Sequence, residues 1–195
     1  LDRLASEGML FDNFFCASPV CSPARASLLT GRIPSQHGVH DWLRNDNKKQ
    51  EDIEYLEGMK AYTDVLAANG YICGLSGKWH LGNSAKPQKS YSHWFAHKSG
   101  GGPYYNAPLY KDGVLYNEPR YVTDVITDDA LEFIDENAGK QPFYLTACYT
   151  APHSPWVNNH HKEYTDLYKD CPFDSIPKEK EHPDSIYLTK EVAKD

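Results

Sequence analysis

Residues 61–75, A-Y-T-D-V-L-A-A-N-G-Y-I-C-G-L, contain a complete structural unit of the predicted fold. Residues 61–69 carry a helical pattern, Gly70 stops it, and the apolar run 71–75 has the composition of a buried strand. A helix, a glycine and an apolar strand in this order are typical of an α/β sheet with mainly parallel strands.

The same order of elements occurs twice more along the chain. Residues 1–6 have a helical pattern that Gly8 ends, and the apolar run 9–15 follows as a predicted strand. A longer amphipathic helix is predicted over 123–137, with a strand over 143–149 after it. The three units share their architecture but no residue-level repeat. We therefore predict an α/β fold in which a mainly parallel sheet is flanked by helices.

Composition limits the classes of function. The chain has 195 residues, enough for one domain with a sizeable core, and its 40% hydrophobic content indicates a globular protein. The formal net charge of −7 argues against a nucleic-acid partner, and an anionic substrate would need a local positive pocket. No apolar run reaches the length of a membrane span. The five cysteines follow no zinc-binding spacing.

Chemically active side chains follow each predicted strand. Cys21 and Arg25 come after the first, Lys78 and His80 after the second, and His153 after the third. In open α/β sheets, ligands bind beyond the carboxyl ends of the strands. The sequence therefore predicts that these five residues meet at one edge of the sheet and form an anion site.

The stretch C-S-P-A-R at residues 21–25 has the features of a helix start. Pro23 suits a first helical turn, Ser22 is the predicted N-cap, and Gly31 is the predicted terminator of a short helix. Cys21 then lies just ahead of a helix N-terminus, where free N–H groups favour an anion, and Arg25 adds a permanent positive charge. The alternative is a buried structural cysteine before an ordinary capped helix.

The two later motifs also have alternatives. Taken alone, the run K-W-H at residues 78–80 is more often a solvated lysine beside a packed tryptophan than a site. His153 lies between Pro152 and Pro155, which would hold its backbone rigid, yet a lone loop histidine is usually just exposed.

Further candidates concern the substrate. Residues 36–44, which include His37 and His40, and the aromatic, glycine-rich stretch 94–110 are the predicted substrate contacts. Within the second stretch, three tyrosines could stack on a sugar ring: Tyr104, Tyr105 and Tyr110. His160 and His161 are predicted to be surface residues.

Several motifs together resemble one protein family. The run C-S-P-A-R-A-S-L-L-T-G-R at 21–32 resembles the motif of the type I, formylglycine-dependent sulfatases of the alkaline-phosphatase-like superfamily. The runs L-D-R-L-A at 1–5, G-K-W-H-L-G at 77–82 and Y-T-A-P-H-S-P at 149–155 are similar to other elements of that family, in the same order. The resemblance covers roughly residues 1–160.

The resemblance implies a sulfuric ester hydrolase, acting on a sulfated small molecule or glycan, whose nucleophile is made from Cys21. That cysteine would be oxidised to formylglycine by a formylglycine-generating enzyme or an anaerobic maturase, and its hydrated form would be nucleophile and metal ligand. Arg25 would hold the diol, Lys78 would contact diol and sulfate, and His80 would accept a proton from the second hydroxyl. His153 would bind the sulfate and assist the leaving oxygen.

The resemblance also implies a divalent metal, calcium, with magnesium as the alternative. Only Cys21, as formylglycine, would be a metal ligand within this chain, because the family's aspartate and asparagine ligands would lie before Leu1 and after Asp195. Residues 1–195 are thus expected to be part of a single sulfatase catalytic domain, with the N-terminal metal-ligand strand and the C-terminal portion missing, and to be inactive alone. The chain closes in a helical pattern at 188–192. It has no N-x-S/T sequon, which favours a periplasmic or secreted bacterial enzyme.

Two alternative functions stay open at this point. A phosphonate or phosphodiester hydrolase of the same superfamily shares the C-x-P-x-R element, and aryl sulfate and aryl phosphonate substrates would separate the two. A non-catalytic sulfoglycan-binding protein would keep Cys21 as an unmodified thiol.

Overall fold

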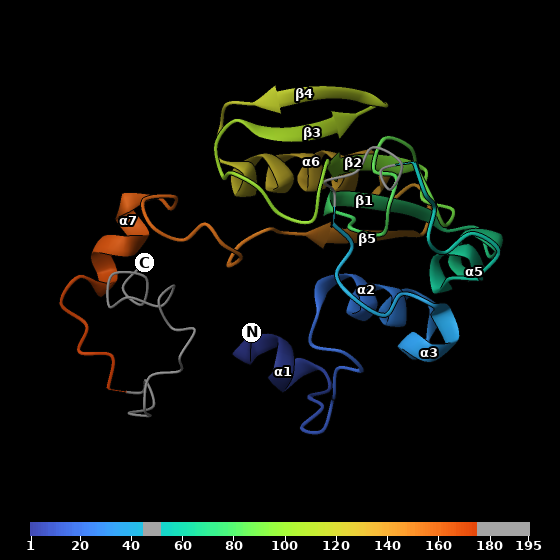
Figure 1. Cartoon of the computed structure of the whole chain (residues 1–195), viewed down its shortest axis with the longest axis horizontal. Helices are drawn as coiled ribbons and strands as arrows, with labels where there is room; N and C mark the ends of the chain where they lie inside the picture. Colours follow the sequence, from blue (N-terminus) through green and yellow to red (C-terminus); the bar gives the residue numbers. More distant parts are fainter. Residues whose placement is uncertain (45–51, 175–195) are drawn as a thin grey trace.

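The computed structural model describes residues 1–44 and 52–174 (Figure 1). Its helices are α1 (Asp2–Glu7), α2 (Cys21–Thr30), α3 (Pro34–His37), α5 (Tyr62–Ala68), α6 (Val122–Asn137) and α7 (Lys162–Thr165), followed by the 3-10 turn η1 (Asp166–Tyr168). None of the helices in these two ranges is long and apolar enough to cross a membrane. The helical pattern predicted at 188–192 lies outside the described residues.

One five-stranded sheet, in the order β4-β3-β2-β1-β5, forms the centre of the fold. β1 (Ile72–Lys78) pairs in parallel with β2 (His93–His97) on one side and with β5 (Phe143–Cys148) on the other. β3 (Ala107–Lys111) and β4 (Val114–Glu118) add an antiparallel hairpin next to β2. The predicted α/β fold is confirmed, with β1 and β5 where two strands were expected. The sheet is mixed rather than mainly parallel because of the hairpin.

The hairpin was not predicted, although its turn was visible in the sequence. Asp112 and Gly113, between β3 and β4, have φ values of 52° and 76°. A two-residue connection with positive φ at both positions is the turn that matches the twist of paired antiparallel strands, and Asp-Gly is a preferred pair for it.

Helices cover both faces of the sheet, and the alternation of side chains along β1 shows which face is which. Ser76 donates a hydrogen bond from Oγ to the carbonyl oxygen of Ile126 in α6 over 3.0 Å. Cys73, an odd number of residues away, places Sγ 3.8 Å from the carbonyl oxygen of Thr63 in α5. From Cys73 to Ser76, even-numbered residues thus face α6 and odd-numbered ones face α5 and α2. Gly77, with φ 107°, interrupts this alternation, and Lys78 lies on the α2 side.

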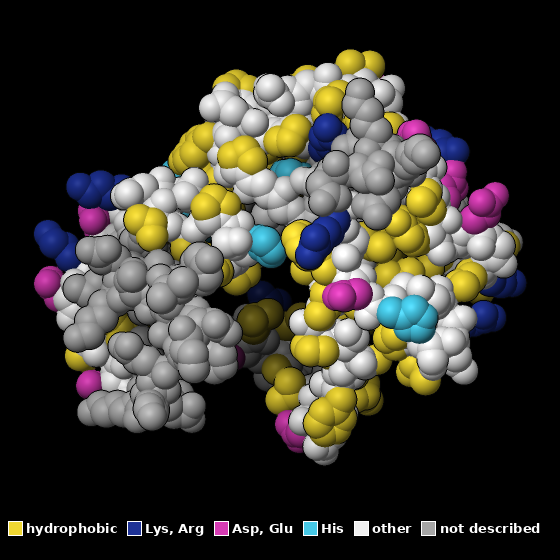
Figure 2. Space-filling model, in the orientation of Figure 1, with side chains coloured by type: hydrophobic (Ala, Val, Ile, Leu, Met, Phe, Trp, Pro, Cys, Tyr) yellow, Lys and Arg dark blue, Asp and Glu magenta, His cyan; other side chains and the backbone are white. Residues whose placement is uncertain are grey.

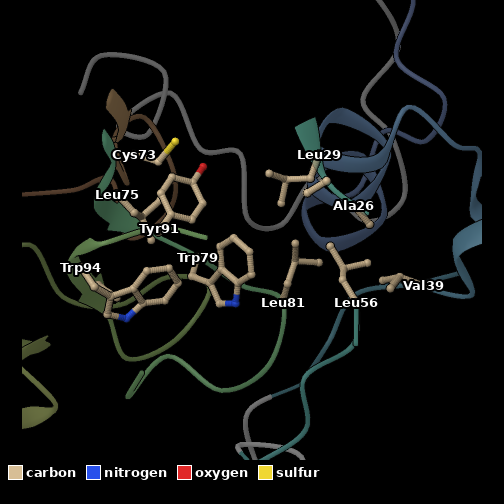
Figure 3. Packing of buried hydrophobic residues seen from close by; sticks show 12 residues of the cluster. Ala26, Leu29, Val39, Leu56, Cys73, Leu75, Trp79, Leu81, Tyr91 and Trp94 are labelled. Atoms are coloured by element: carbon tan, nitrogen blue, oxygen red, sulfur yellow. The ribbon is translucent and has the colours of Figure 1, made fainter. Parts of the chain in front are cut away.

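The core on the α2 and α5 side is rich in aromatic rings (Figure 3). The ring of Trp79, just beyond β1, packs edge-on against Trp94 and Tyr91, with centroids 5.2 and 6.2 Å apart. Ala26 and Leu29 bring α2 into the same cluster. Because Cys21 begins α2 and Lys78 ends β1, this packing also fixes the two elements that carry the predicted reactive residues.

The strand predicted at residues 9–15 is not formed. α1 is present as expected, but the segment after it is irregular. Its large apolar side chains are 65–85% exposed, and Figure 2 shows hydrophobic side chains gathered on this N-terminal part: Met9, Leu10, Phe11, Phe14 and Phe15. Strand-like composition produces a strand only where a neighbouring edge accepts its hydrogen bonds, and in the described residues this segment pairs with none.

Candidate active site

Cys21 is the first residue of α2, so the helix begins two positions earlier than the sequence suggested. Val20 has the extended backbone of an N-cap, with φ −129° and ψ 142°, so the prediction of Ser22 as N-cap is wrong. The Ser22 hydroxyl instead accepts a hydrogen bond from the Leu43 N–H at 3.3 Å. Gly31 ends the helix as predicted, with φ 66°. Cys21 therefore lies in the first turn, where unpaired N–H groups favour a negative charge.

Arg25 and Lys78 form a cationic pair next to Cys21. Nη1 of Arg25 donates to the main-chain carbonyl oxygen of Lys78 over 2.8 Å and lies 3.4 Å from Sγ of Cys148, at the end of β5. The Lys78 residue is only 5% exposed. Burial, and then the charge of Arg25, lower the pKa of Lys78, whereas its charge interaction and hydrogen bond with Cys21 raise it. The Lys78 ammonium group thus faces the Cys21 side chain.

His80 is held as a neutral base. Its Nε2 lies 2.9 Å from the carbonyl oxygen of Leu43. A carbonyl can only accept, so Nε2 carries the proton and Nδ1 has a free lone pair. In the described part of the chain, that buried Nδ1 has no hydrogen-bond partner. Burial first, and then the charges of Lys78, Arg25 and His153, lower the pKa of His80 to about 4.

His153 lies in the loop after β5 and is the exposed member of the group. Its Nδ1 lies 2.8 Å from the carbonyl oxygen of Ser154, which places the proton on Nδ1 and leaves Nε2 as the acceptor. Its own carbonyl oxygen accepts a hydrogen bond from the Tyr104 hydroxyl over 2.6 Å. The adjacent glycines Gly100 and Gly101 lie against the rings of His80 and His153, so the two imidazoles are neighbours.

A further histidine, His97, lies beside this group. It is the last residue of β2, pairs with Lys78 in the parallel ladder, and is fully buried. Its Nδ1 accepts a hydrogen bond from the Ser99 N–H at 3.2 Å. Burial, and then the charge of Lys78, lower the pKa of His97 to about 4. It was missed because H-W-F-A-H at 93–97 was not recognised as a strand, since a polar residue stands at each end of its apolar centre.

The sulfatase family model matches residues 1–185. The chain belongs to the sulfatase family. Its mixed sheet flanked by helices is the alkaline-phosphatase-like fold of that family.

Relatives and solved structures with similar chains carry sulfatase names or sulfated ligands. Human N-acetylgalactosamine-6-sulfatase is 35% identical over 180 residues, which cover 80% of this chain and 34% of the human protein. The N-acetylglucosamine-6-O-sulfatase of Bacteroides thetaiotaomicron is 31% identical over 159 residues, covering 80% of this chain and 26% of that protein. The structure of BT4656 in complex with its substrate D-glucosamine-2-N,6-O-disulfate is 29% identical, with a TM-score of 0.72, covering 88% of this chain and 32% of that one. The chain thus spans about a quarter to a third of the length of these relatives.

Two predicted substrate contacts are packing residues instead. His37 is 1% exposed: its Nε2 lies 3.0 Å from Oγ of Ser27, and its Nδ1 accepts the Val39 N–H at 3.1 Å. It joins α2 to α3 and does not line a substrate pocket. Tyr104 is fully buried, so its ring is not available to stack on a sugar.

The other aromatic and histidine predictions have mixed outcomes. Tyr105 is 39% exposed and packs against Tyr121, so it is the tyrosine of the loop that solvent reaches. Tyr110 is a residue of β3, and His40 is exposed. His160 is not a simple surface residue, because its Nδ1 lies 2.9 Å from the Tyr121 hydroxyl and its ring packs edge-on against Tyr104.

The residues that the structure describes do not form a metal site by themselves. Within 1–44 and 52–174, no group of three or more His, Cys, Asp or Glu side chains could hold a metal ion. The donor set around Cys21 is also cationic, with Arg25 and Lys78 as the nearest charges. Calcium therefore does not fit these residues alone.

A small cavity is lined by both members of the cationic pair, Arg25 and Lys78. Its volume is about 80 Å³, and leucine and aromatic side chains form most of the remaining lining, with Thr146 and Cys148. Pockets for ligands of drug size span roughly 300–1,000 Å³. The cavity is thus too small for a sulfated sugar. His153, which does not line it, is exposed to solvent.

Proposed function

We propose that the full protein is a sulfuric ester hydrolase that cleaves a sulfate ester on a carbohydrate, with Cys21 converted to formylglycine. The observation that supports this most is the gathering of Arg25, Lys78 and the free Nδ1 of His80 around the helix start that bears Cys21. The names of the two related sulfatases and the disulfated glucosamine bound by BT4656 support sulfated amino sugars as the substrate class.

Formylglycine would supply two hydroxyls on one carbon. One oxygen takes the sulfuryl group as the sugar alcohol leaves, and the other gives up its proton so that its electron pair forms C=O while the C–O bond to sulfate breaks. Water then adds to the aldehyde and restores both hydroxyls. A cysteine or serine side chain lacks the second hydroxyl, which is why the modification is needed.

The cations of the site would stabilise the charge of the sulfuryl group. Lys78 faces Cys21, and Arg25 is fixed by its hydrogen bond to the main chain of Lys78. Because both positions are set before substrate arrives, the site needs little reorganisation to bind the developing charge, and such fixed groups typically supply several kcal/mol.

The two histidines would handle protons at opposite ends of the reaction. His80 is neutral and buried and keeps a lone pair on Nδ1, so it can take the proton of the second hydroxyl. His153 is exposed and keeps its acceptor on Nε2. It would bind the sulfate and, when protonated, assist the departing sugar oxygen.

The remaining requirements of this function involve parts beyond the described residues. We propose that the chain is part of one catalytic domain and that calcium, or magnesium, would draw its oxygen ligands from elsewhere in that domain. A formylglycine-generating enzyme or an anaerobic maturase would modify Cys21, and the protein would work in the periplasm or outside the cell.

Peptide mass spectrometry of Cys21 tests the proposal, on full-length protein from its native host or made with a maturase. The expected result is CHO in place of CH2SH, trapped with a hydrazine, together with faster turnover of aryl sulfate than of aryl phosphonate. Faster turnover of the aryl phosphonate would show that the protein is a phosphonate hydrolase and not a sulfatase. An intact thiol under maturing conditions, with no turnover, would overturn the mechanism in favour of a sulfoglycan-binding protein.

A further inference from the structure

Three consecutive glycines follow β2, and each lies against a different imidazole ring. A Cβ atom built on each would contact a ring that comes from a different strand end. The contacts would be 2.0 Å to Cε1 of His80 at Gly100, 3.1 Å to Cε1 of His153 at Gly101, and 2.8 Å to Cε1 of His97 at Gly102. The loop thus lies across the ends of β1, β5 and β2.

Space, not backbone conformation, is what requires glycine here. None of the three glycines is among those with positive φ in the described chain. Real Cβ atoms essentially never approach another atom below 3.0 Å, so alanine at Gly100 or Gly102 must displace a ring or the loop. At Gly101 the same substitution needs a shift of only a few tenths of an ångström.

The loop is anchored on both sides, so the rings cannot simply push it away. Before the glycines, the Ser99 N–H binds Nδ1 of His97 and the Ser99 hydroxyl donates to the carbonyl oxygen of Gly101. After them, the Tyr104 hydroxyl donates to the His153 carbonyl over 2.6 Å. The Val122 N–H, at the start of α6, donates to the Tyr104 carbonyl over 2.7 Å.

His80 is consequently held from two sides. On one side, the Leu43 carbonyl accepts a hydrogen bond from Nε2–H at 2.9 Å. On the other, the backbone of Gly100 lies so close to the ring that an added Cβ would be 2.2 Å from each ring nitrogen. These two contacts leave Nδ1 as the free ring atom and fix the direction of its lone pair. A side chain at position 100 would have to move that lone pair.

We propose that the loop Ser99–Tyr104 is a positioning element of the reaction site, in which Gly100 holds the His80 ring with Nδ1 directed to the hydroxyl it deprotonates. This inference rests on the proposed function, because the proton in question is the one lost when sulfate is released. Gly100 touches no reacting atom, and its effect is exerted through His80.

The proposal predicts a particular kinetic pattern. A misplaced His80 slows sulfate release but not the preceding transfer of sulfate from the sugar. When only the later step is slowed, kcat and KM fall together and kcat/KM is nearly unchanged. General-base catalysis typically contributes about 10²–10⁴-fold, so we expect kcat of Gly100→Ala to fall by ~100-fold.

The experiment compares Gly100→Ala and Gly102→Ala in the full-length protein, each checked by mass spectrometry for the aldehyde at Cys21. Gly102→Ala is the matched control for the clash, because it meets the ring of His97, which the proposed proton transfers do not use. It should lower Tm and leave kcat within ~3-fold. If Gly100→Ala does not fold, Ser99→Ala loosens the loop without a clash and should lower kcat and KM together by a smaller factor.

A second readout does not depend on activity. In full-length Cys21→Ser protein labelled with ¹⁵N-histidine, His80 should show a single Nε2–H tautomer, and Gly100→Ala should convert it to a mixture. Wild-type kcat, KM and tautomer in Gly100→Ala would overturn the proposal. If the wild-type enzyme carries the aldehyde yet hydrolyses no sulfate ester, the proposed function fails, while the tautomer comparison still decides whether the loop positions His80.

Discussion

Arg25 donates a hydrogen bond from Nη1 to the main-chain carbonyl oxygen of Lys78 over 2.8 Å. This contact joins the first turns of α2 to the carboxyl end of β1, two elements separated by more than forty residues of chain. It fixes the helix that begins at Cys21 relative to the strand that ends at Lys78. The charged side chain of Arg25 therefore also sets how Lys78 lies relative to Cys21.

Arg25→Lys tests this double role. A lysine keeps the charge but cannot reproduce the fork of donors that reaches the Lys78 carbonyl and approaches Cys148. We expect the free energy of unfolding of the full-length protein to fall by about 1–3 kcal/mol, because a part-buried carbonyl loses its partner. Urea denaturation measures this, with the exposed Arg32→Lys as control. Equal stability of the two variants would show that the hydrogen bond contributes nothing.

Tyr104→Phe removes the hydroxyl that binds the His153 carbonyl and keeps the ring that stacks on Tyr121. The cost in unfolding free energy should be about 1 kcal/mol. Because the His153 loop loses an anchor, KM for an aryl sulfate should rise several-fold with kcat little changed. The control is Tyr105→Phe, whose ring is 39% exposed. A Tyr104→Phe enzyme with unchanged KM would show that the hydroxyl does not hold the histidine loop.

Long periodic segments were predictable, and the site followed from them. The helix at 123–137 became α6 (Val122–Asn137), and the strands at 71–75 and 143–149 became β1 and β5. Their apolar runs are bounded by glycine or proline, so their type and position depend mainly on local sequence. The residues just after β1 and β5 were thereby placed at one edge of the sheet.

Features that depend on partners distant in sequence were missed. The segment 9–15 has strand composition but no pairing edge, and H-W-F-A-H at 93–97 became a strand because β1 and β3 flank it. Nothing in three glycines indicates which rings they will contact. The contact of Gly100 with His80 follows only from the arrangement of β1 and β2 in the sheet.

Gly77→Ala should disrupt the end of β1. Gly77 has φ 107°, and a Cβ there would lie 2.1 Å from the carbonyl oxygen of Cys148, which is backbone and cannot turn aside. We expect a loss of at least about 3 kcal/mol in unfolding free energy, since strain and clash add. Gly139→Ala is the matched control, because Gly139 also has positive φ, 76°, but open space around it. Chemical denaturation of the full-length variants measures both, and equal losses would show that the contact with β5 is not limiting.

His97 should make the stability of the protein depend on pH. Burial, with the charge of Lys78, lowers its pKa from 6.5 to about 4 in the folded state. Between these two values the unfolded chain binds more protons at this position than the folded chain does. The contribution of neutral His97 to the free energy of unfolding is therefore fully present above pH 6.5 and is lost as the pH falls toward 4. The loss is on the order of 3 kcal/mol, because each pKa unit between the unfolded and folded values corresponds to about 1.4 kcal/mol.

The measurement is the free energy of unfolding from pH 7 to 4.5 for wild type and His97→Gln. Glutamine can still accept the Ser99 N–H, which binds Nδ1 at 3.2 Å in the wild type, but it does not titrate. The variant should show a shallower decline below pH 6.5, while the exposed His40→Gln should follow the wild-type curve. Parallel curves for all three proteins would show that His97 takes up a proton in the folded state as readily as in the unfolded chain, contrary to its burial beside Lys78.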